Sequence, residues 1–459
     1  LDHMQRDYKD KKIVIVGAGS TGCSLARFFR ARGAQVTLSD NRSADRLNDL
    51  DELQQLGVDL DLGGHTPQLF TTADLVVVSP GVPLDVPVLE ACRKQGVMIL
   101  GEIEIAWQEL AGTMIAITGT NGKSTVTTLV GEMLQAWGEH VFVGGNLGTP
   151  LIDAVGHDYN WQVAELSSFQ LETIEAFRSR YAMLLNVSED HLDRYSDMAS
   201  YLAAKARIFE NLLETDVAIL NHDDPLVLQA AAQTRAMKVC FSSQSVLENG
   251  MSLVDDKILW RWQENETLFP LGELQLRGRH NQENVMAAMI PLLMEGCPAE
   301  VVWNTARSFT GLPHRMEPLG ELRGASWFND SKGTNIGSVV KSLSGLNKPV
   351  VLIAGGKDKH GDLSSLAGPI KEKVSHLILI GVAAERMAKA FAGLAEIHRA
   401  DSMHKAVKLA DRLSQQGGAV LLSPGCSSFD MFKSFEERGE IFIREFRALS
   451  RHGESANGD

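Results

Sequence analysis

The stretch Met114-Ile-Ala-Ile-Thr-Gly-Thr-Asn-Gly-Lys-Ser-Thr125 joins an apolar run to a loop with two glycines and then to a helical pattern. Residues 114–117 form a continuous apolar run, as in a strand buried on both faces of a parallel sheet. From Thr125, apolar residues recur at three- and four-residue spacing as far as Trp137, and Gly138 follows where a helix C-terminal cap belongs. The pattern predicts a strand, a loop and a helix in direct succession.

A glycine loop at a helix N-terminus is suited to phosphate binding. Unpaired backbone N–H groups and the positive end of the helix dipole attract anions, and glycines let the backbone approach them. Here Lys123 could reach a terminal phosphate, and the hydroxyl of Ser124 or Thr125 could hold Mg²⁺. The loop departs from the standard P-loop, because that pattern needs a glycine where this chain has Ile117. A tight strand-to-helix turn without a ligand is therefore the alternative.

A second glycine motif lies near the start of the chain, in Lys12-Ile-Val-Ile-Val-Gly-Ala-Gly-Ser-Thr-Gly22. Its spacing is that of dinucleotide-binding folds, and a helix is expected over about 24–32. The next apolar run ends at Asp40, where such folds place an acid beside the ribose. The motif indicates a Rossmann-like domain. It does not identify the ligand, so an NAD-dependent oxidoreductase and a turn that serves only packing both remain open.

Polar side chains follow two later strands of the sheet expected to carry the phosphate loop. Glu165 ends one strand, and His191 follows the next in a loop crowded with possible metal ligands. Because the ends of parallel strands converge on one edge of a sheet, we expect both near the ligand. On local sequence alone, Lys205 is expected on a solvated helix face, and Asn281 and Asn284 are expected to cap a helix.

Size and composition limit the class of protein. A chain of 459 residues is too long for one core, so two or three domains are expected. The balance of 44 basic against 58 acidic residues gives a formal charge of −14, which disfavours a broad nucleic-acid or membrane surface. The five cysteines are scattered without zinc-site or disulfide spacing. We expect a cytoplasmic protein, a monomer, without nucleic-acid or membrane partners.

The last third of the chain repeats one arrangement. Three apolar runs each end in a polar loop with glycine, within 327–335, 350–359 and 419–433. This alternation predicts another α/β unit. The whole chain is therefore expected to be α/β with three domains, over residues 5–101, 102–311 and 312–459.

Several of these motifs, taken together, resemble the Mur ligase family of ATP-dependent amide-forming enzymes. The resemblance extends from about Lys12 to Phe442, and the shortened glycine loop is the form that this family uses. The runs 166–172 and 422–439 are most similar to the members that add D-glutamate to UDP-N-acetylmuramoyl-L-alanine in peptidoglycan synthesis. The motifs are Thr118-Gly-Thr-Asn-Gly-Lys-Ser-Thr125, the Glu165 segment, Glu189-Asp-His-Leu-Asp193, Gly311-Leu-Pro-His-Arg315 and Asn329-Asp-Ser-Lys332.

The resemblance implies a Rossmann-like domain for the UDP substrate, a central P-loop-type ATPase domain with a mostly parallel sheet, and a Rossmann-like C-terminal domain for the amino acid. The residues implied to hold the UDP substrate are Ser20, Thr21, Asp40, Arg42, Ser79, Gly81, Asn146 and Ser167. Asn41 stands where relatives often carry threonine, so a contact there is not implied. The residues implied to receive D-glutamate are Lys332, Thr334, Lys359, Ser428 and Phe435.

The resemblance also implies ATP and two Mg²⁺ sites. ATP would contact Gly119, Asn121, Gly122, Lys123, Ser124, Thr125, Asn281, Asn284, Arg315 and Asp330. Ser124 would hold one Mg²⁺, and Glu165, His191 and Lys205 would hold the second. Lys205 would be carbamylated, which turns a cation into a carboxylate-like ligand and reverses the local expectation of a solvated lysine. Lys123, His191 and Lys205 are thus the implied catalytic residues.

The expected chemistry is amide formation through an acyl phosphate, with ATP as the phosphoryl donor. Three alternatives stay open on the sequence. They are another Mur-type or folylpolyglutamate-type ligase, the NAD-dependent oxidoreductase, and a nucleotide-binding switch without chemistry.

Overall fold

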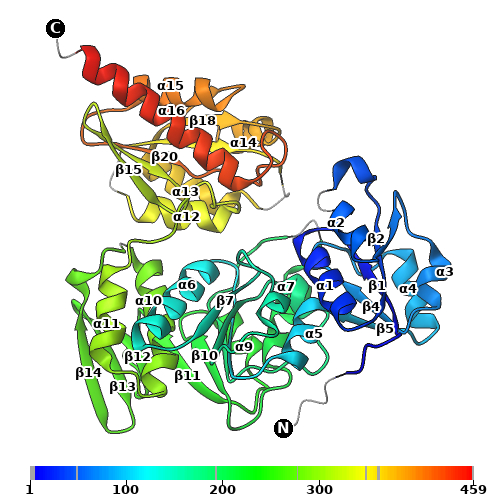
Figure 1. Ribbon diagram of the computed structural model, residues 1–459. Coiled ribbons are helices and arrows are strands. Elements are labelled where there is room, and N and C mark those ends of the chain that lie inside the picture. The colour runs from blue at the N-terminus through cyan, green and yellow to red at the C-terminus, as the bar shows by residue number, and fades with distance from the viewer. Residues whose placement is uncertain are drawn as a thin grey trace. The chain divides into compact units, whose positions relative to one another are not determined.

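The structure is a computed structural model that describes residues 6–47, 50–191, 194–276, 278–346, 349–358 and 362–456, without the side chains of residue 46 and residues 452–456. Three β-sheets are present among these residues (Figure 1). The chain divides into two compact units. The first comprises Leu1–Asn186, Tyr201–Glu273 and Glu283–Arg307, and the second comprises Val187–Ser200, Leu274–Gln282 and Ser308–Asp459.

The first sheet is parallel and has the strand order β3-β2-β1-β4-β5. Its strand order reverses beside β1, which lies between β2 and β4. Such a reversal leaves a crevice at the carboxyl ends of the strands. The strands are β1 Lys12–Val16, β2 Gln35–Asp40, β3 Asp59–Leu62, β4 Leu75–Val78 and β5 Met98–Gly101. The helices around them are α1 Ser20–Ala31, η1 Ala44–Arg46, α2 Leu50–Gln55, α3 Pro67–Thr71 and α4 Pro87–Lys94.

The second sheet, also in the first unit, has nine strands in the order β14-β13-β12-β11-β10-β9-β6-β8-β7. It is parallel from β7 to β12, and β13 and β14 extend it as an antiparallel ribbon. The strand that precedes the phosphate loop, β6, lies between β8 and β9. The strands are β6 Thr113–Thr118, β7 Val141–Gly145, β8 Trp161–Glu165, β9 Tyr181–Leu184, β10 Val217–Asn221, β11 Met237–Ser242, β12 Gly250–Val254, β13 Lys257–Trp262 and β14 Asn265–Pro270.

The helices associated with this sheet include the one that follows the phosphate loop, α6 Lys123–Trp137. The others are α5 Glu102–Glu109, η2 Leu151–Ala154, α7 Ser168–Leu171, α8 Met198–Ala206, η3 Arg207–Phe209, α9 Pro225–Ala230, η4 Leu271–Glu273, α10 Arg279–Met294 and α11 Ala299–Ser308.

Two buried carboxylates of α5 bind backbone N–H groups near the second sheet. Glu102 accepts a hydrogen bond of 2.7 Å from the N–H of Ile152 in η2. Glu104 accepts three, from the N–H groups of Glu175, Ala176 and Phe177. Because α5 directly follows β5 of the first sheet, these bonds tie the two sheets of the first unit together.

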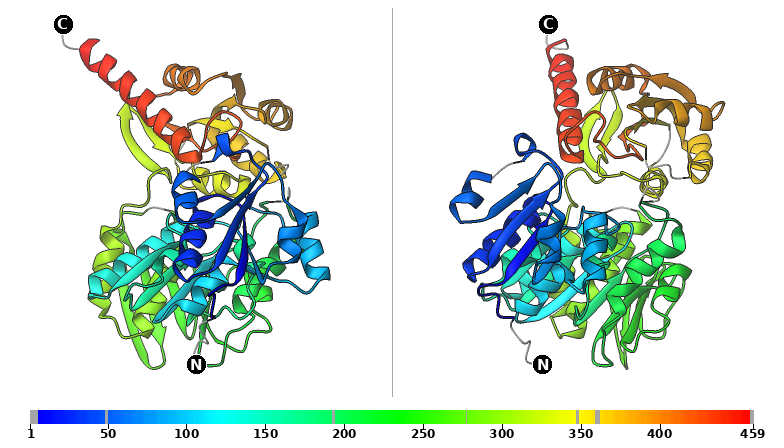
Figure 2. Two further views of the ribbon diagram at one scale, coloured as in Figure 1. Left: turned by 45° about the vertical axis from the view of Figure 1, so that its right-hand side comes forward. Right: turned by 90° about the vertical axis from the view of Figure 1, so that its right-hand side faces the viewer.

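The third sheet lies in the second unit and has the order β15-β16-β20-β17-β18-β19, antiparallel only between β15 and β16. Leu377 and Leu379 face one core, whereas Ile378 and Ile380 face the other. Figure 2 shows α16 running along β15 and β16. The strands are β15 Glu317–Leu322, β16 Ala325–Asn329, β17 Val350–Gly355, β18 Val374–Ile380, β19 Glu396–Arg399 and β20 Ala419–Leu422. The helices are α12 Ile336–Ser344, α13 Ser364–Lys373, α14 Ala384–Ala390, α15 Met403–Leu413 and α16 Phe435–Ala456.

The α/β class and the mostly parallel sheets are confirmed, while two predicted helix starts were late. The helix after the phosphate loop begins at Lys123, two residues before the expected Thr125, and α1 begins at Ser20. In both cases the helix begins with residues of the glycine loop, Ser20-Thr-Gly in α1 and Lys123-Ser-Thr in α6, which carry no apolar periodicity. Within the described part of the chain, no helix is both long and apolar enough to cross a bilayer.

Candidate active site

The predicted phosphate loop joins β6 to α6 in the first unit. Gly122 occupies the position before the helix with φ 86°, in the left-handed region. A Cβ atom at this position would overlap the side-chain oxygen of Asn284 in α10. The loop therefore needs glycine for its backbone conformation and for the close approach of Asn284. Because α10 begins at Arg279, Asn284 lies beyond the N-cap, and the expected capping role is wrong for it.

Two lysines converge on one backbone oxygen of this loop. The ammonium groups of Lys123 and Lys205 each donate a hydrogen bond of 2.9 Å to the carbonyl of Gly119. Lys205 is only 1% exposed, and its ammonium lies 4.7 Å from the centre of the Tyr201 ring. The local expectation of a solvated lysine is therefore wrong, because α8 packs this face against the loop.

Asn186 holds the loop from the side of β9. Its side chain accepts a hydrogen bond from the N–H of Asn121 and donates one to the carbonyl of Asn121, both at 2.9 Å. Its own carbonyl accepts from the N–H of Thr120 at 2.9 Å. Sequence reasoning missed Asn186, although its place directly after a buried strand beside β6 was a usable signal.

Glu165 is the last residue of β8 and is 3% exposed. Its side chain accepts a hydrogen bond of 2.6 Å from the amide of Asn146, and its carbonyl accepts one of 2.8 Å from the Asn146 N–H. Asn146 was predicted to contact the UDP substrate, and Glu165 to bind metal. The pair therefore links the two predicted sites within the first unit.

The loop residues fit a nucleotide phosphate with Mg²⁺. Buried hydroxyls of Ser124 and Thr125 stand in the first turn of α6, where the N–H groups have no acceptor within the helix. The Lys123 ammonium supplies positive charge, and the Glu165 carboxylate is an oxygen ligand of the kind that Mg²⁺ prefers. A Cβ at Gly122 would displace the side chain of Asn284 from its place against this loop.

A cavity of about 520 Å³ lies in the first unit, at the reversal of strand order in the first sheet. Residues after β1, β2, β4 and β7 contribute to its walls. Seven of the eight residues predicted to hold the UDP substrate line it, and they are Ser20, Thr21, Asp40, Arg42, Ser79, Gly81 and Asn146. Asn41 also lines the cavity, as does Gln170, which sequence reasoning missed. Ser167 is instead the N-cap of α7, in a reciprocal capping box with Gln170.

Asp40 is held as an anion in this cavity. Burial raises the pKa of its carboxyl group, but hydrogen bonds from the Arg42 side chain and from the N–H groups of Ala18 and Arg42 outweigh burial and lower the pKa to about 2. The Arg42 side chain donates to both oxygens, at 2.9 and 2.7 Å. The third glycine of the motif, Gly22, has a packing role, because a Cβ there would overlap the carbonyl of Gly17.

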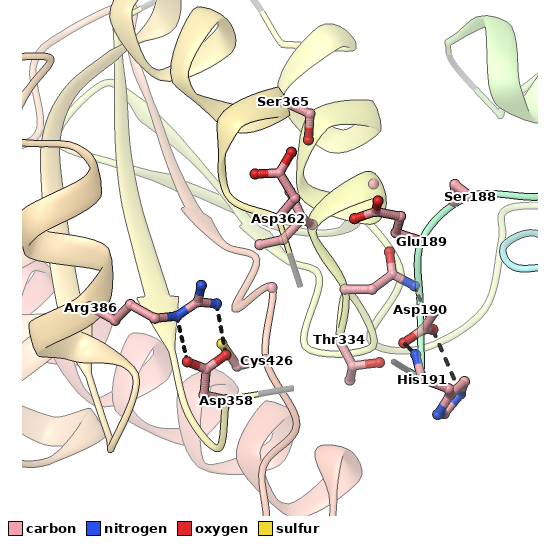
Figure 3. A pocket seen from close by; sticks show the side chains of 14 residues that line it. Ser188, Glu189, Asp190, His191, Thr334, Asp358, Asp362, Ser365, Arg386 and Cys426 are labelled. Atoms are coloured by element: carbon pink, nitrogen blue, oxygen red, sulfur yellow. Dashed lines mark hydrogen bonds and ion pairs between the residues drawn. The ribbon is translucent and has the colours of Figure 1, made fainter. Parts of the chain in front are cut away.

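A cavity of about 300 Å³ lies in the second unit, beside the loops that follow β16, β17 and β20 (Figure 3). Thr334 and His191, both predicted site residues, line it together with Cys426. On its wall the guanidinium of Arg386 forms an ion pair with the carboxylate of Asp358, with N–O distances of 2.5 and 2.8 Å. Asp358 and Arg386 were missed, and the only available signal was the position of Asp358 after a strand.

His191 stands in a short polar network of the second unit. Its Nε2 atom is 3.7 Å from Oδ2 of Asp190, and the same oxygen accepts a hydrogen bond of 3.0 Å from Asn335, the N-cap of α12. The φ angle of His191 is 56°, in the left-handed region that side chains seldom occupy. The network fixes the start of α12 against residues 190–191.

Asp330 is buried in the second unit. Its Oδ2 atom accepts hydrogen bonds of 2.7 Å from the hydroxyls of Ser342 and Ser423. Burial raises the pKa of Asp330 to about 6, with these bonds and the positive charge of Arg315 acting in the opposite direction. Arg315 donates its N–H to the carbonyl of Leu312.

The other residues that were predicted to bind ATP or D-glutamate, where the structure describes them, do not form one cluster. The Lys332 ammonium lies 3.7 Å from the centre of the Phe435 ring, so these two predicted residues are neighbours. Ser428 is buried, at 2% exposure. Asn281 is in the first turn of α10, in the second unit, after the helix start, so capping is wrong for it too. Lys359 lies outside the described residues.

The chain matches three family descriptions in succession. They are "Mur ligase MurD-like, N-terminal domain" over residues 11–101, "Mur ligase middle domain" over 117–292, and "Mur ligase, glutamate ligase domain" over 314–426. A UDP-N-acetylmuramoylalanine–D-glutamate ligase of Syntrophotalea carbinolica is 56% identical, over 97% of this chain and 100% of that protein. The protein of the same name from Geotalea uraniireducens is 49% identical, over 96% of this chain and 98% of its own.

Solved structures agree in fold. The UDP-N-acetylmuramate–alanine ligase MurC of Thermotoga maritima aligns with a TM-score of 0.59 at 19% identity, over 95% of this chain and 99% of that one. MurF of Acinetobacter baumannii aligns with a TM-score of 0.58 at 16% identity, over 95% and 91%. The family descriptions cover most of the sequence, and the 56% identity runs almost end to end, so the chain belongs to the Mur ligase family.

Proposed function

We propose that this chain is an ATP-dependent ligase that joins D-glutamate to UDP-N-acetylmuramoyl-L-alanine, in the cytoplasmic synthesis of peptidoglycan precursors. The observation that carries the proposal is the 56% identity, over 97% of the chain, to a relative named for this reaction. Two sites in the first unit support it. One is a cavity built from residues expected to hold a UDP substrate, and the other is a glycine loop with two lysines.

Three domains would divide the work, with residues 5–101 for the UDP substrate, 102–311 for ATP and 312–459 for the amino acid. Each range contains one of the three sheets. D-glutamate would contact Lys332, Thr334, Lys359, Ser428 and Phe435. The contact between Lys332 and Phe435, and the position of Thr334 on a cavity wall, support this assignment.

ATP would lie on the loop of Gly119, Asn121 and Gly122, with its phosphates facing Lys123, Ser124 and Thr125. Lys123 would leave its loop carbonyls to contact the terminal phosphate. Asn284 supports the assignment through its approach to Gly122. Asn281, Arg315 and Asp330 would complete the nucleotide site.

The reaction would proceed in two steps. The alanyl carboxylate attacks the γ-phosphorus of ATP, which gives an acyl phosphate and ADP. The amine of D-glutamate then attacks the acyl carbon, loses a proton, and expels inorganic phosphate as the amide forms. Lys123 and the N-terminus of α6 would stabilise the negative charge on the transferring phosphoryl group.

Two Mg²⁺ sites are proposed, one at Ser124 and one at Glu165, His191 and Lys205. When bound, Mg²⁺ supplies positive charge that offsets the phosphoryl oxygens. Lys205 would serve as a carbamate. Its 1% exposure and its hydrogen bond to the phosphate loop support a role for this lysine in the site.

We also propose that the protein works as a monomer in a reducing compartment. All five cysteines are free thiols, and four of them are buried. This arrangement is typical of cytoplasmic proteins.

Release of inorganic phosphate by the purified protein tests the function. ATP, Mg²⁺ and UDP-N-acetylmuramoyl-L-alanine are supplied with D-glutamate, with L-glutamate, or with no amino acid. Release that depends on D-glutamate is expected, and Lys123→Ala should abolish it. Release with another amino acid or with a folate would instead assign a different ligase activity, and unchanged turnover in Lys123→Ala would overturn the ATP site.

A further inference from the structure

Two histidines and a glutamate meet on the edge of the third sheet. His376 lies in β18, and Glu396 and His398 lie in the edge strand β19. His376 is paired in register with Glu396, and His398 follows two residues later. Because side chains alternate between the faces of a strand, all three project from the same face.

The three side chains bring four ligand atoms together, two imidazole nitrogens and both oxygens of one carboxylate. Nδ1 of His376 is 3.3 Å from Nε2 of His398 and 3.5 Å from a carboxylate oxygen of Glu396. Nε2 of His398 is 3.4 Å from the other oxygen of that carboxylate. In a tetrahedral zinc site with ligands at about 2.0–2.1 Å from the metal, neighbouring ligand atoms are about 3.3 Å apart. The two imidazole nitrogens are at this spacing, and each lies 3.4–3.5 Å from one oxygen of the same carboxylate.

We propose that His376, Glu396 and His398 bind a divalent transition-metal ion, with Zn²⁺ as the best match. Two imidazole nitrogens and one carboxylate suit zinc, cobalt or nickel, whereas Mg²⁺ prefers oxygen ligands throughout. The side chain of Glu396 is 65% exposed, so water has access to the cluster and would supply a fourth ligand. This site would be separate in chemistry and in sequence from the residues proposed to bind ATP.

The consequence of binding is structural. β19 is the edge strand of its sheet and pairs with β18. An ion held by one ligand from β18 and two from β19 would fasten the edge strand to its neighbour. Because the unfolded chain does not assemble the three ligands, binding should stabilise the folded second unit.

Cobalt titration of the metal-stripped full-length protein tests the proposal. Excess Mg²⁺ is kept present, so that hard-cation sites are filled. We expect one Co²⁺ per chain with the visible absorption of a tetrahedral complex, displaced by Zn²⁺ and unaffected by further Mg²⁺. Zn²⁺ should also raise the Tm, and a chelator should reverse the rise.

Variants identify the ligands. His376→Ala and His398→Ala should each lose the cobalt absorption and the zinc-dependent rise in Tm, and Glu396→Gln should weaken both. His404→Ala is the matched control, because this exposed imidazole also contacts a carboxylate, that of Glu445, at 2.7 Å. In the part of the chain that the structure describes, His404 belongs to no cluster of three ligands. Equal cobalt binding by all variants, or none by the parent protein, would leave only an ion-paired cluster and overturn the site. Circular dichroism and phosphate release confirm that each variant is folded.

Discussion

The ammonium of Lys205 donates a hydrogen bond of 2.9 Å to the carbonyl oxygen of Gly119, inside the phosphate loop. Lys123 donates to the same oxygen at the same distance. The Gly119 carbonyl thus accepts hydrogen bonds from two lysines, one in α6 and one in α8. Because this contact is direct, a substitution of Lys205 should alter the phosphate loop without any large movement of the chain.

Replacing Lys205 by alanine should reduce phosphate release by about 100-fold, the usual scale for losing one electrostatic group at a phosphoryl-transfer site. If the lysine acts as a carbamate, acetate or another short carboxylic acid should restore part of the activity. Lys238→Ala, at an exposed lysine of β11, should change nothing. Failure of every short acid to rescue Lys205→Ala would count against the carbamate.

Gly122→Ala should abolish ATP-dependent turnover while the protein stays folded. The new Cβ would overlap Asn284 and would also sit on a backbone with positive φ. Gly138→Ala is the matched control, because Gly138 has φ 94° but nothing near its Cβ position. It should lose about 1 kcal/mol of stability and keep its activity. ATP binding by calorimetry and urea unfolding separate the two effects, and equal activity in both variants would contradict the assignment.

Asn186→Ala should raise the KM for ATP and lower kcat. It removes two hydrogen bonds to Asn121, at about 1 kcal/mol each, which together correspond to roughly 30-fold in kcat/KM. Asn211→Ala removes two similar bonds, to the carbonyls of Glu175 and Phe177. That control should lose stability without a change in KM. If both variants lose only stability, Asn186 has no specific role in positioning the loop.

Glu102 should make the first unit less stable as the pH rises. Burial raises the pKa of Glu102 to about 7, with the Ile152 N–H acting against it. Between about pH 4.5 and pH 7 the folded protein keeps a proton that the unfolded chain releases, so this contribution is complete below about pH 4.5 and lost as the pH rises through 7. The full effect is about 3 kcal/mol as an upper figure.

Glu102→Gln should remove that dependence, so its stability relative to the parent protein should improve between about pH 5 and pH 8. Urea unfolding at several pH values measures the difference. Glu104→Gln is the contrasting variant. It should destabilise at every pH, because three backbone N–H groups would lose a carboxylate acceptor. Parallel pH profiles for Glu102→Gln and the parent protein would refute the prediction.

Arg438→Met should destabilise the second unit by about 3 kcal/mol. The guanidinium is fully buried and donates to the hydroxyl and carbonyl of Ser331 and to the carbonyl of Cys426. Burial lowers the pKa of Arg438 to about 10, so it stays charged at neutral pH. Arg444→Met, on the exposed side of the same helix, should stay within about 0.5 kcal/mol. Denaturant unfolding compares the two, and similar losses would show that the buried network contributes little.

The elements with a clear period or an uninterrupted apolar run could be predicted from the sequence. β6, α6, β1 and β4 lie close to their expected positions. Helix starts were misplaced where a glycine loop supplies the first turn, because Ser20 and Lys123 carry no apolar signal. Resemblance, rather than local pattern, supplied Lys205 and Asn284 as site residues.

Contacts made by polar side chains across the sheet could not be predicted. The place of Asn186 after an apolar run indicates the end of a buried strand, but it has no motif of its own, and its contact with Asn121 is known only from the hydrogen bonds of the structure. The pair of Asp358 and Arg386 joins the loop after β17 to α14, 28 residues further along the chain. The His376 cluster likewise depends on strand register, which the sequence alone does not give.

The place of β20 in the third sheet bears on how the protein is made. β16 and β17 do not pair with each other, because β20 lies between them and pairs with β16 on one side and with β17 on the other. During synthesis on the ribosome, two groups of strands form before β20, the hairpin of β15 and β16 and the group of β17, β18 and β19. They cannot join into one sheet until residues 419–422 emerge. A nascent chain stalled before that point would expose both open strand edges, so translation of the last strand decides when this part of the protein can close its core.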